Sequence, residues 1–433
     1  MTLYQNPDAE KWAQLCERPQ LELSFLEGSV RNIMNRVRNS GDHALREITV
    51  QFDKVNVDQL RVSADEIEAA KNTLDASLQE AIKTAAKNIE LFHDSQRRDT
   101  AKVDTMPGVT CWRKSVGIEK VGIYIPGGTA PLFSTVLMLG IPARLAGCRE
   151  IVLCTPPSKD GKINPAILYA ADLVGVTAIF KVGGAQAIAA MAYGTESIPK
   201  VYKIFGPGNQ YVTKAKQLVL EEGVAIDMPA GPSEVLVIAD KTANPAFVAA
   251  DLLSQAEHGE DSQVILVVLD ENAIDNIKKE IENQLKRLPR KDIAQKALVH
   301  SRIISFNDTD TAIAFVNEYA PEHLIINTSN VDEIAGKIVN AGSVFLGNYS
   351  PEAIGDYASG TNHTLPTNGY AKAYAGVSLE SFMKNITFQQ LTAEGLVKLG
   401  PAVERMAEAE QLEGHRQAIS IRLKEIQQST KGV

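Results

Sequence analysis

Three short stretches of this 433-residue sequence bring together side chains that bind metals or transfer protons. In the first, DLLSQAEHGEDSQ (251–263), Gln255 and His258 lie three residues apart near the end of an expected helix, with Glu257 between them. Residues three apart share one face of a helix, whereas adjacent residues point about 100° apart. The spacing therefore favours Gln255 over Glu257 as a partner of His258 in metal binding, although zinc usually takes His, Cys or carboxylate ligands. The alternative interpretation is an ordinary polar helix end.

The second stretch, YAPEHLII, places Glu322 and His323 directly before an apolar segment that we expect to be a strand. A carboxylate and an imidazole both exchange protons near neutral pH, so this pair indicates acid–base chemistry. A solvated loop without a catalytic role is the alternative that the residue types leave open.

The third stretch, SPEAIGDYASGTNHTLPT (350–367), contains Glu352, Asp356, Asn362 and His363 among glycines and prolines. Loops of this composition between regular elements often carry functional side chains. We therefore expect part of a functional site here as well.

Three glycine-rich turns follow apolar segments, at residues 125–135, 182–190 and 205–213. A strand, a glycine turn and a helix N-terminus form a general phosphate site, because free backbone N–H groups point toward the anion. None of the turns matches the G-x-G-x-x-G fingerprint, so tight turns without a ligand are the alternative. Three such turns on one sheet edge favour a ligand site, because strand ends are where α/β sheets hold ligands.

Alternating helix and strand patterns must position these side chains. From about residue 22 to residue 98, apolar residues recur three and four apart, which is typical of amphipathic helices. After residue 115, short apolar runs ending in Gly or Pro alternate with helical patterns, and a second such set begins near residue 234. This predicts the α/β class, with two neighbouring parallel-sheet domains that are Rossmann-like but lack the fingerprint. The helical region after residue 380 has a weak core signal, so we expect it to pack on another body, such as a second subunit.

Composition narrows the function classes. The net charge of -9 argues against a nucleic-acid or anionic-membrane partner, since both favour a basic surface. No apolar run approaches the roughly 20 residues of a membrane helix, and the N-terminus lacks a signal-peptide pattern. The four cysteines are scattered, which suits a reducing compartment. We expect a cytoplasmic enzyme.

Eight sequence blocks, taken in order, closely resemble the histidinol dehydrogenase family. They extend over nearly the whole chain: VGIYIPGGTAPLFSTVLML, VGGAQAIAA, KIFGPGN, IDMPAGPSEVLVIAD, DLLSQAEHG, APEHLI, GDYASGTNHTLPT and EGHR. The resemblance implies a zinc-dependent homodimer that oxidises L-histidinol through L-histidinal to L-histidine with two NAD.

The resemblance also implies roles for individual residues. With one zinc ion per subunit, the ligands would be Gln255, His258, Asp356 and His415. Glu322 and His323 match the catalytic pair. Substrate contacts would come from the zinc ligands and His323, together with Ser233, His363 and Glu410. NAD contacts would come from Tyr124, Gln186 and Asn209. Because the family's C-terminal arm crosses to the partner, Glu410 and His415 would complete the other subunit's site.

Combining pattern and resemblance, we expect four regions. They are an N-terminal helical extension (1–24), a discontinuous first α/β domain (25–123 and 234–377), a second, NAD-binding α/β domain (124–233) and a C-terminal helical dimerisation arm (378–433). Both extensions are expected to pack on the dimer partner.

The implied site suits the implied reaction. One carboxylate, two neutral imidazoles and one amide around Zn²⁺ leave a net charge of about +1. We expect the metal mainly to fix histidinol, which offers an imidazole nitrogen and an amine. His323, with an ordinary pKa of about 6.5, would take the hydroxyl proton. Glu322 would activate the water that hydrates the aldehyde, because hydride must leave a tetrahedral carbon.

The residue types leave three alternatives open. A cysteine nucleophile is one, since Cys148 and Cys154 flank an expected strand, although cysteine is among the most buried residue types. A zinc-dependent hydrolase of a phosphorylated small molecule, with Glu322 as the base, is the second. A metal-loaded binding protein that uses the same residues is the third.

Overall fold

The computed structural model describes residues 1–19, 26–98, 100–127, 130–229 and 231–431. The predicted boundary between residues 24 and 25, and Gly128 and Thr129 of the first glycine turn, lie outside the described residues. The chain forms two compact units, the first from Met1–Gln96 and Ile118–Phe382, the second from Arg97–Gly117 and Met383–Val433. Among the described residues, no helix is both long and apolar enough to cross a membrane.

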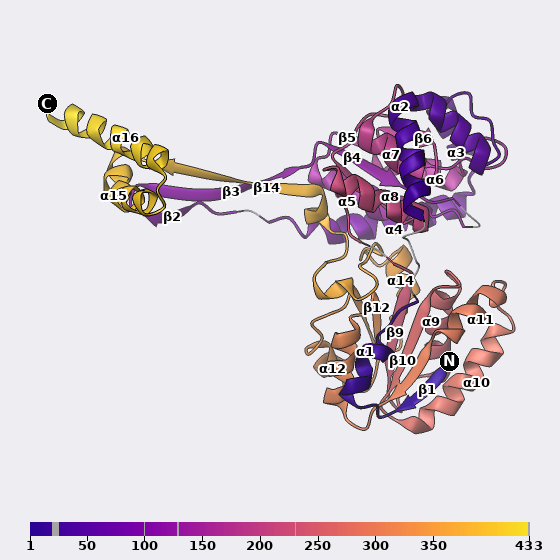
Figure 1. Cartoon of the computed structure of the whole chain (residues 1–433). Coiled ribbons are helices and arrows are strands. Elements are labelled where there is room, and N and C mark those ends of the chain that lie inside the picture. The colour runs from indigo at the N-terminus through magenta and orange to yellow at the C-terminus, as the bar shows by residue number, and fades with distance from the viewer. Residues whose placement is uncertain (20–25, 99, 128–129, 230, 432–433) are drawn as a thin grey trace. The chain divides into compact units, whose positions relative to one another are not determined.

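The first unit contains a six-stranded parallel sheet with the strand order β1-β11-β10-β9-β12-β13 (Figure 1). The strands are β1 (Thr2–Gln5), β9 (Glu234–Ala239), β10 (Gln263–Val268), β11 (Arg302–Ser305), β12 (His323–Asn327) and β13 (Ser343–Leu346). The central strands β9, β10 and β12 are buried along their whole length. Such continuous apolar strands are typical of a parallel sheet that is covered on both faces.

Helices cover both faces of this sheet because successive strand residues point in opposite directions. Val235 and Val237 pack with one helix layer, while Leu236 and Ile238 pack with the other. The first layer is α9 (Pro245–Ala256), α10 (Ile274–Leu285) and α11 (Lys291–Val299), and the second is α1 (Trp12–Leu15), α12 (Thr309–Tyr319) and α13 (Val331–Ala335). Asn244 caps α9 by accepting a hydrogen bond from Ala246 N, and Pro245 starts the helix.

The first unit also contains a five-stranded parallel sheet with the order β6-β5-β4-β7-β8. The strands are β4 (Lys120–Tyr124), β5 (Glu150–Thr155), β6 (Ala178–Lys181), β7 (Lys203–Phe205) and β8 (Ala225–Ile226). Its connecting helices are α5 (Phe133–Ala146), α6 (Pro165–Val174), α7 (Gly184–Tyr193) and α8 (Gln210–Glu221). Together the two parallel sheets confirm the predicted fold class.

Three early helices pack on this five-stranded sheet and its connecting helices. They are α2 (Glu27–Phe52), α3 (Ala64–Thr73) and α4 (Ala76–Asp94). Val30 and Leu45 of α2 share a core with Ile188 of α7 and Leu218 of α8. This packing differs from the predicted grouping of residues 25–123 with 234–377. Amphipathic periodicity shows that a helix buries one face, but not which sheet covers that face.

The N-terminal segment differs in part from the predicted helical extension. It contains the helix α1, but it begins with strand β1, which pairs with β11 from Thr2 opposite Arg302 to Gln5 opposite Ser305. Four residues are too few for a periodicity to reveal an edge strand. Short 3-10 helices complete the first unit: η1 (Ala9–Lys11), η3 (Glu271–Ala273), η4 (Tyr370–Lys372) and η5 (Leu379–Phe382), beside the α-helix α14 (Glu352–Tyr357).

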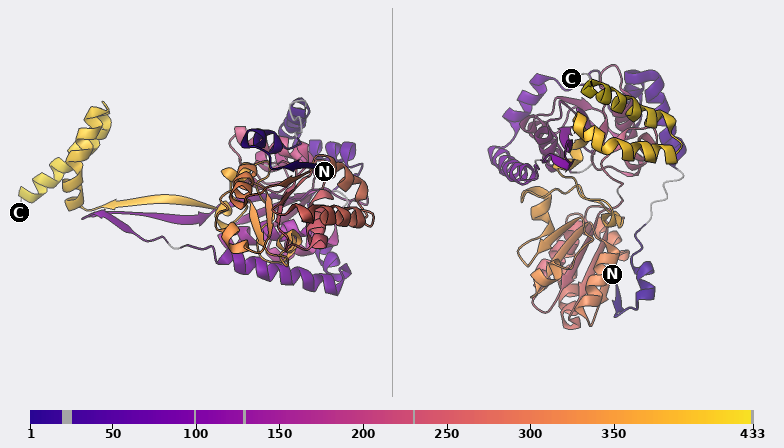
Figure 2. Two further views of the ribbon diagram at one scale, coloured as in Figure 1. Left: turned by 90° about the horizontal axis from the view of Figure 1, so that it is seen from below. Right: turned by 90° about the vertical axis from the view of Figure 1, so that its left-hand side faces the viewer.

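The second unit contains an antiparallel sheet as well as the predicted helices. Its strands β2 (Val103–Met106), β3 (Val109–Gly117) and β14 (Met383–Leu391) have the order β14-β3-β2, followed by α15 (Ala393–Ala409) and α16 (Glu413–Lys431). Figure 2 shows β3 and β14 side by side, and nine residue pairs join them. Trp112 and Phe388 stack across this ribbon with ring centroids 5.4 Å apart. The sequence did not predict these strands. Their residues are mostly half-exposed or exposed, so they lack a clear apolar alternation, and β3 and β14 are far apart in the sequence.

Candidate functional site

The backbone of β9 holds the Glu322–His323 pair at the start of β12. The N–H of Glu234 donates to Glu322 Oε2 at 2.9 Å, and the carbonyl oxygen of Glu234 lies 3.2 Å from His323 Nδ1. His323 Nδ1 is also 3.5 Å from Glu322 Oε2, and both side chains are buried. Because β9 and β12 are parallel neighbours, their first residues meet at the amino edge of the six-stranded sheet. A buried carboxyl group beside an imidazole is suited to proton transfer.

A second layer of polar contacts holds Glu234 itself. Arg18 donates from Nε to Glu234 Oε2 at 2.8 Å, and Tyr319 Oη lies 3.2 Å from the same oxygen. Tyr319 Oη also donates to Gln263 Oε1 at 2.8 Å, and the guanidinium of Arg18 stacks over the Tyr319 ring. Every charged group in this layer has a partner, as buried charges require. The start of β9 is therefore a fixed support for the Glu322–His323 pair.

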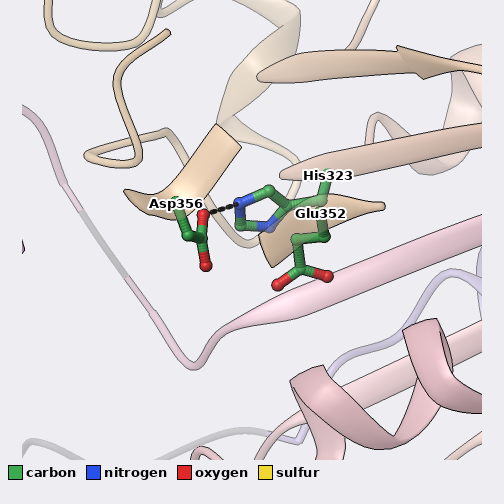
Figure 3. Close-up of side chains that lie close together, drawn as sticks. All are labelled: His323, Glu352 and Asp356. Carbon is green, nitrogen blue, oxygen red and sulfur yellow. Dashed lines mark ion pairs between the residues drawn. The ribbon is translucent and has the colours of Figure 1, made fainter. Parts of the chain in front are cut away.

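Two carboxyl groups of α14 lie near the His323 ring. Glu352 and Asp356 are four residues apart on α14, and Asp356 Oδ1 lies 3.4 Å from His323 Nε2 (Figure 3). One possible ligand atom from each of these three residues lies within 4.8 Å of the others. Imidazole and carboxylate groups at this spacing are suited to bind a divalent metal ion.

The concentration of negative charge shifts the pKa values of these groups. Burial lowers the pKa of His323, but the charges of Glu352, Glu322 and Asp356 outweigh burial and raise it well above its usual value. Burial raises the pKa of Glu352 to about 8, with His323 opposing this rise and Asp356 adding to it. Burial also acts to raise the pKa of Asp356, but His323, His363 and His258 lower it below its usual value. The cluster thus holds more acidic groups than basic ones, and a bound cation would stabilise their ionised forms.

Gln255 and His258 meet at the carboxyl end of α9, as their spacing predicted. Hydrogen-bond partners assign the amide of Gln255: its nitrogen donates to both carboxyl oxygens of Glu352, at 3.2 Å from Oε2, and its oxygen accepts from His258 Nδ1 at 3.3 Å. Gln255 is completely buried, whereas His258 is exposed. The side chain of Glu257 makes no hydrogen bond or ion pair with other residues in the described part of the chain. Because α9 returns from the carboxyl edge of β9, its end lies at the amino edge, beside Glu322 and His323.

The donor spacings fit a zinc site. Two ligands bonded to one tetrahedral zinc at about 2.0–2.1 Å lie roughly 3.3 Å apart. The amide oxygen of Gln255 and Nδ1 of His258, two of the predicted ligands, are 3.3 Å apart. His323 Nε2 is buried without a hydrogen bond among the described residues. The residues present therefore fit a divalent metal such as zinc. Asp356 belongs both to the predicted ligand set and to the cluster of His323, Glu352 and Asp356.

The predicted substrate contacts fall into two groups. Ser233 is half-buried directly before β9, beside Glu234. His363 lies next to Asp356, where its Nδ1 is 2.8 Å from the Asp356 carbonyl oxygen and its Nε2 is 2.9 Å from Thr135 Oγ1. Both ring nitrogens of His363 are thus engaged, so a substrate that binds there must replace one of these contacts.

Glu410 and His415 belong to the second unit. Glu410 follows α15, His415 lies near the start of α16, and both side chains are exposed. Their part in the site stays a prediction.

The three predicted NAD contacts line one cavity of about 630 Å³ at the carboxyl edge of the five-stranded sheet. Tyr124 ends β4, and its Oη accepts a hydrogen bond of 3.0 Å from Gly184 N at the start of α7. Gln186 is buried on α7, and Asn209 caps α8 by accepting hydrogen bonds from Tyr211 N and Val212 N. Helix N-termini after strands form sites for phosphate groups, so the cavity suits a nucleotide.

The cysteines lack the surroundings of a nucleophile. Cys154 is completely buried in β5, and burial raises the pKa of its thiol far above the usual value. Burial raises the pKa of Cys148 to about 12. Because the thiolate is the reactive form, neither residue is activated. The geometry therefore favours water over cysteine as the nucleophile.

Several residues around the cluster were missed or left without a role by the sequence. The sequence pattern gives Glu352 no role within its loop, and it does not distinguish Asp251, Glu234 or Thr135 from other polar residues. Asp251 is buried, and burial raises its pKa to about 7. Two signals were available: Glu352 precedes Asp356 by four residues, and Asp251 precedes Gln255 by four, and this spacing puts each pair on one helix face.

Known proteins are similar to this chain over nearly its full length. A family model described as histidinol dehydrogenase matches residues 16–423. The chain is 62% identical over 426 residues to the histidinol dehydrogenase of Bacteroides fragilis, covering 98% of this chain and 100% of that protein. It is 54% identical over 416 residues to the chloroplastic histidinol dehydrogenase of Arabidopsis thaliana, covering 95% of this chain and 89% of that one. The crystal structure of histidinol dehydrogenase from Elizabethkingia anophelis matches with a TM-score of 0.97 and 57% identity over 99% of each chain. The chain therefore belongs to the histidinol dehydrogenase family.

Proposed function

We propose that this protein oxidises L-histidinol through L-histidinal to L-histidine, with two NAD as oxidants and one zinc ion per subunit. Family membership makes it an oxidoreductase of histidine biosynthesis, and the proposal adds the cofactors and the residue roles. It rests chiefly on one observation: an acid–base pair, two further carboxyl groups and an amide–imidazole pair converge at one edge of the six-stranded sheet.

Gln255, His258 and Asp356 are the proposed zinc ligands from one subunit, with His415 supplied by a second subunit. A bound zinc ion would hold the imidazole and amine of histidinol and offset the carboxylate charge around His323. Glu352 accepts hydrogen bonds from the Gln255 amide and so leaves its oxygen, the atom that a metal prefers, beside His258. Ser233, His363 and Glu410 are the proposed additional substrate contacts.

In the first oxidation, His323 accepts the proton of the substrate hydroxyl as hydride leaves the same carbon. A zinc cation beside the ring would counter the carboxylate charges that raise the pKa of His323, so that the neutral ring is free to accept this proton. The backbone oxygen of Glu234 and the carboxyl group of Glu322 hold the ring through Nδ1, so that Nε2 faces Asp356 and the substrate side. NAD supplies the hydride acceptor. This assignment uses the ring nitrogen that has no other hydrogen bond among the described residues.

In the second oxidation, Glu322 activates the water that adds to the aldehyde. The aldehyde carbon carries only one hydrogen and is planar, so hydride can leave only after water has made it tetrahedral. Burial raises the pKa of Glu322, which makes its carboxylate a stronger base than an exposed one, although His323 opposes the shift. A single site that retains the aldehyde through both steps also prevents its loss to solvent.

NAD is proposed to bind in the cavity beside the five-stranded sheet, with Tyr124, Gln186 and Asn209 as contacts. The support is the placement of all three residues in one cavity of about 630 Å³. That size is within the usual range of cofactor sites, about 300–1,000 Å³.

The deciding experiment mixes purified, zinc-replete protein with L-histidinol and NAD and follows the absorbance of NADH. We expect two NADH for each histidinol consumed and histidine as the product. A hydrolase would release product without NAD, and a binding protein would retain histidinol without converting it. No NADH formation by zinc-replete protein would refute the proposed function.

A metal-depletion experiment tests the zinc role separately. We expect chelation to abolish NADH formation and added zinc to restore it. Because His258 is a proposed ligand, His258→Asn should sharply lower the zinc content measured by elemental analysis. Full activity in metal-free protein would contradict the zinc role without affecting the NAD assignment.

A further inference from the structure

The cavity beside the five-stranded sheet contains one charged side chain among its described lining residues. That residue is Asp53, which directly follows α2. No lysine or arginine belongs to the described lining. The polar lining otherwise consists of neutral groups such as Tyr124, Gln186 and Asn209. A ligand with an additional phosphate at the position of Asp53 would therefore meet a negative charge and no described cation.

The carboxyl group of Asp53 has an unused acceptor. Its Oδ2 is buried, and no group in the described part of the chain donates a hydrogen bond to it. Burial raises the pKa of Asp53, and its charge contributes, after burial, to raising the pKa of Tyr124 to about 12. Both side chains line the cavity. A buried carboxylate oxygen without a donor is costly to the free protein unless a ligand supplies the donor.

We propose that Asp53 accepts hydrogen bonds from the ribose hydroxyls of the adenosine half of NAD and makes the cavity selective against NADP. This inference rests on the proposed function. A carboxylate accepts from two adjacent hydroxyls and repels a 2′-phosphate, which is how acidic residues distinguish the two cofactors in other nucleotide-binding α/β folds. Asp53 reaches this position from α2, outside the sheet and its glycine turns.

Neighbouring residues support the adenosine half of the cofactor at this end of the cavity. Phe52, next to Asp53, lines the cavity although it belongs to the exposed large apolar residues, with 57% of its surface accessible. Ile33 and Ile167 add further apolar surface to the lining. Apolar side chains beside a carboxylate suit an adenine and its ribose. The N-terminus of α7, which has no side-chain cap, offers backbone N–H groups for the pyrophosphate.

The test measures binding by calorimetry and turnover with three nucleotides: NAD, NADP and an NAD analogue without the 2′-hydroxyl on the adenosine ribose. We expect the unmodified protein to bind the analogue and NADP at least about tenfold more weakly than NAD, because a hydrogen bond to a charged group is lost. In Asp53→Asn, the affinity for NAD should fall about tenfold, and the preference for NAD over NADP should fall by at least that factor. The exposed Asp58 provides the control: Asp58→Asn removes the same charge outside the cavity lining and should change neither ratio.

Each outcome separates the inference from the proposed function. An unchanged NAD-to-NADP preference in Asp53→Asn, or equal binding of NAD and the analogue by the unmodified protein, would overturn the role of Asp53 while leaving the dehydrogenase intact. Because the analogue is tested on the unmodified protein, the inference stays falsifiable even if the variant does not fold. Asp53-dependent binding of NAD without histidinol oxidation would support the inference and refute the proposed function.

Discussion

The carboxyl group of Glu352 is almost completely buried, yet it accepts hydrogen bonds from the amide of Gln255 and lies close to the imidazole of His323 (Figure 3). A side chain amide can present either its oxygen or its nitrogen to a metal, and only the oxygen is a suitable ligand. Because Glu352 accepts hydrogen bonds from the amide nitrogen of Gln255, it selects the orientation in which the amide oxygen is available to a metal. Groups that orient metal ligands in this way commonly affect metal affinity by about 10–100-fold.

We therefore predict that Glu352→Ala weakens zinc binding by about 10–100-fold, and that Glu352→Gln, which keeps an acceptor oxygen, weakens it less. Competition with a metal-binding dye measures the affinity directly, without reference to activity. Glu257→Gln is the matched control, because Glu257 has no corresponding contact in the described chain and should leave zinc affinity unchanged. Equal zinc affinity in Glu352→Ala and the unmodified protein would show that the amide is oriented by something else.

Glu322 and His323 share a backbone support but are proposed to serve different steps. We predict that Glu322→Gln slows the oxidation of added L-histidinal by about 10²–10⁴-fold while slowing the first oxidation much less, because only the second step needs an activated water. Stopped-flow measurement of NADH from each substrate, with an aldehyde trap for the first, checks the difference. An equal loss in both steps would assign Glu322 to the shared proton transfer instead.

Among the elements, α2 shows how one buried carboxylate joins distant segments. The helix kinks at Gly41, where φ is 48°, and the next residue, Asp42, accepts hydrogen bonds from Thr195 Oγ1 at 2.7 Å and from Ser197 N at 3.3 Å. Burial alone would raise the pKa of Asp42, but the hydrogen bonds from Ser197 and Thr195 lower it below its usual value. These bonds attach α2 to the segment that follows α7.

This arrangement predicts a defined pH dependence of stability. Because the pKa of Asp42 is lower in the folded protein than in the unfolded chain, its stabilisation is present above the unfolded value of about 3.9 and is lost as the pH falls through the folded value. We predict that Asp42→Asn lowers the free energy of unfolding by roughly 1–3 kcal/mol at neutral pH. The difference should shrink below about pH 4, as measured by urea denaturation across this range. Asp58→Asn, an exposed control, should show neither effect, and a constant difference at all pH values would contradict the role of the charge.

The helix α9 likewise joins distant segments, in this case at the proposed metal site. Its sequence determines that Gln255 and His258 share a face, whereas its position after β9 carries that face to the amino edge of the sheet. There it meets the starts of β9 and β12 and the helix α14. The proposed metal site therefore depends on the register of parallel strands as much as on its ligands.

At the scale of the whole molecule, the proposed roles of Glu410 and His415 require two chains to form one site. Both are exposed on the second unit, and their proposed partners lie on the first. We predict that mixing His415→Asn and Glu322→Gln subunits, neither of which completes the oxidation alone, restores about a quarter of the normal rate of histidine formation under exchange conditions. In a symmetric dimer, half of the randomly mixed pairs are hybrids, and each hybrid contains one intact site. Absence of recovery, with subunit exchange confirmed by differently tagged chains, would contradict an arm that crosses between subunits.

The sequence by itself determined the α/β class, the Gln255–His258 spacing and the Glu322–His323 pair, because periodicity and adjacency are local properties of a chain. It did not determine that α2, α3 and α4 cover the five-stranded sheet, that residues 2–5 form an edge strand, or that β3 pairs with β14. These depend on which surfaces remain to be covered once the sheets have formed. The proposed roles of Glu352 and Asp53 have the same origin. A buried carboxyl group acquires its function from the neighbours that remove its water, and only the tertiary structure supplies those neighbours.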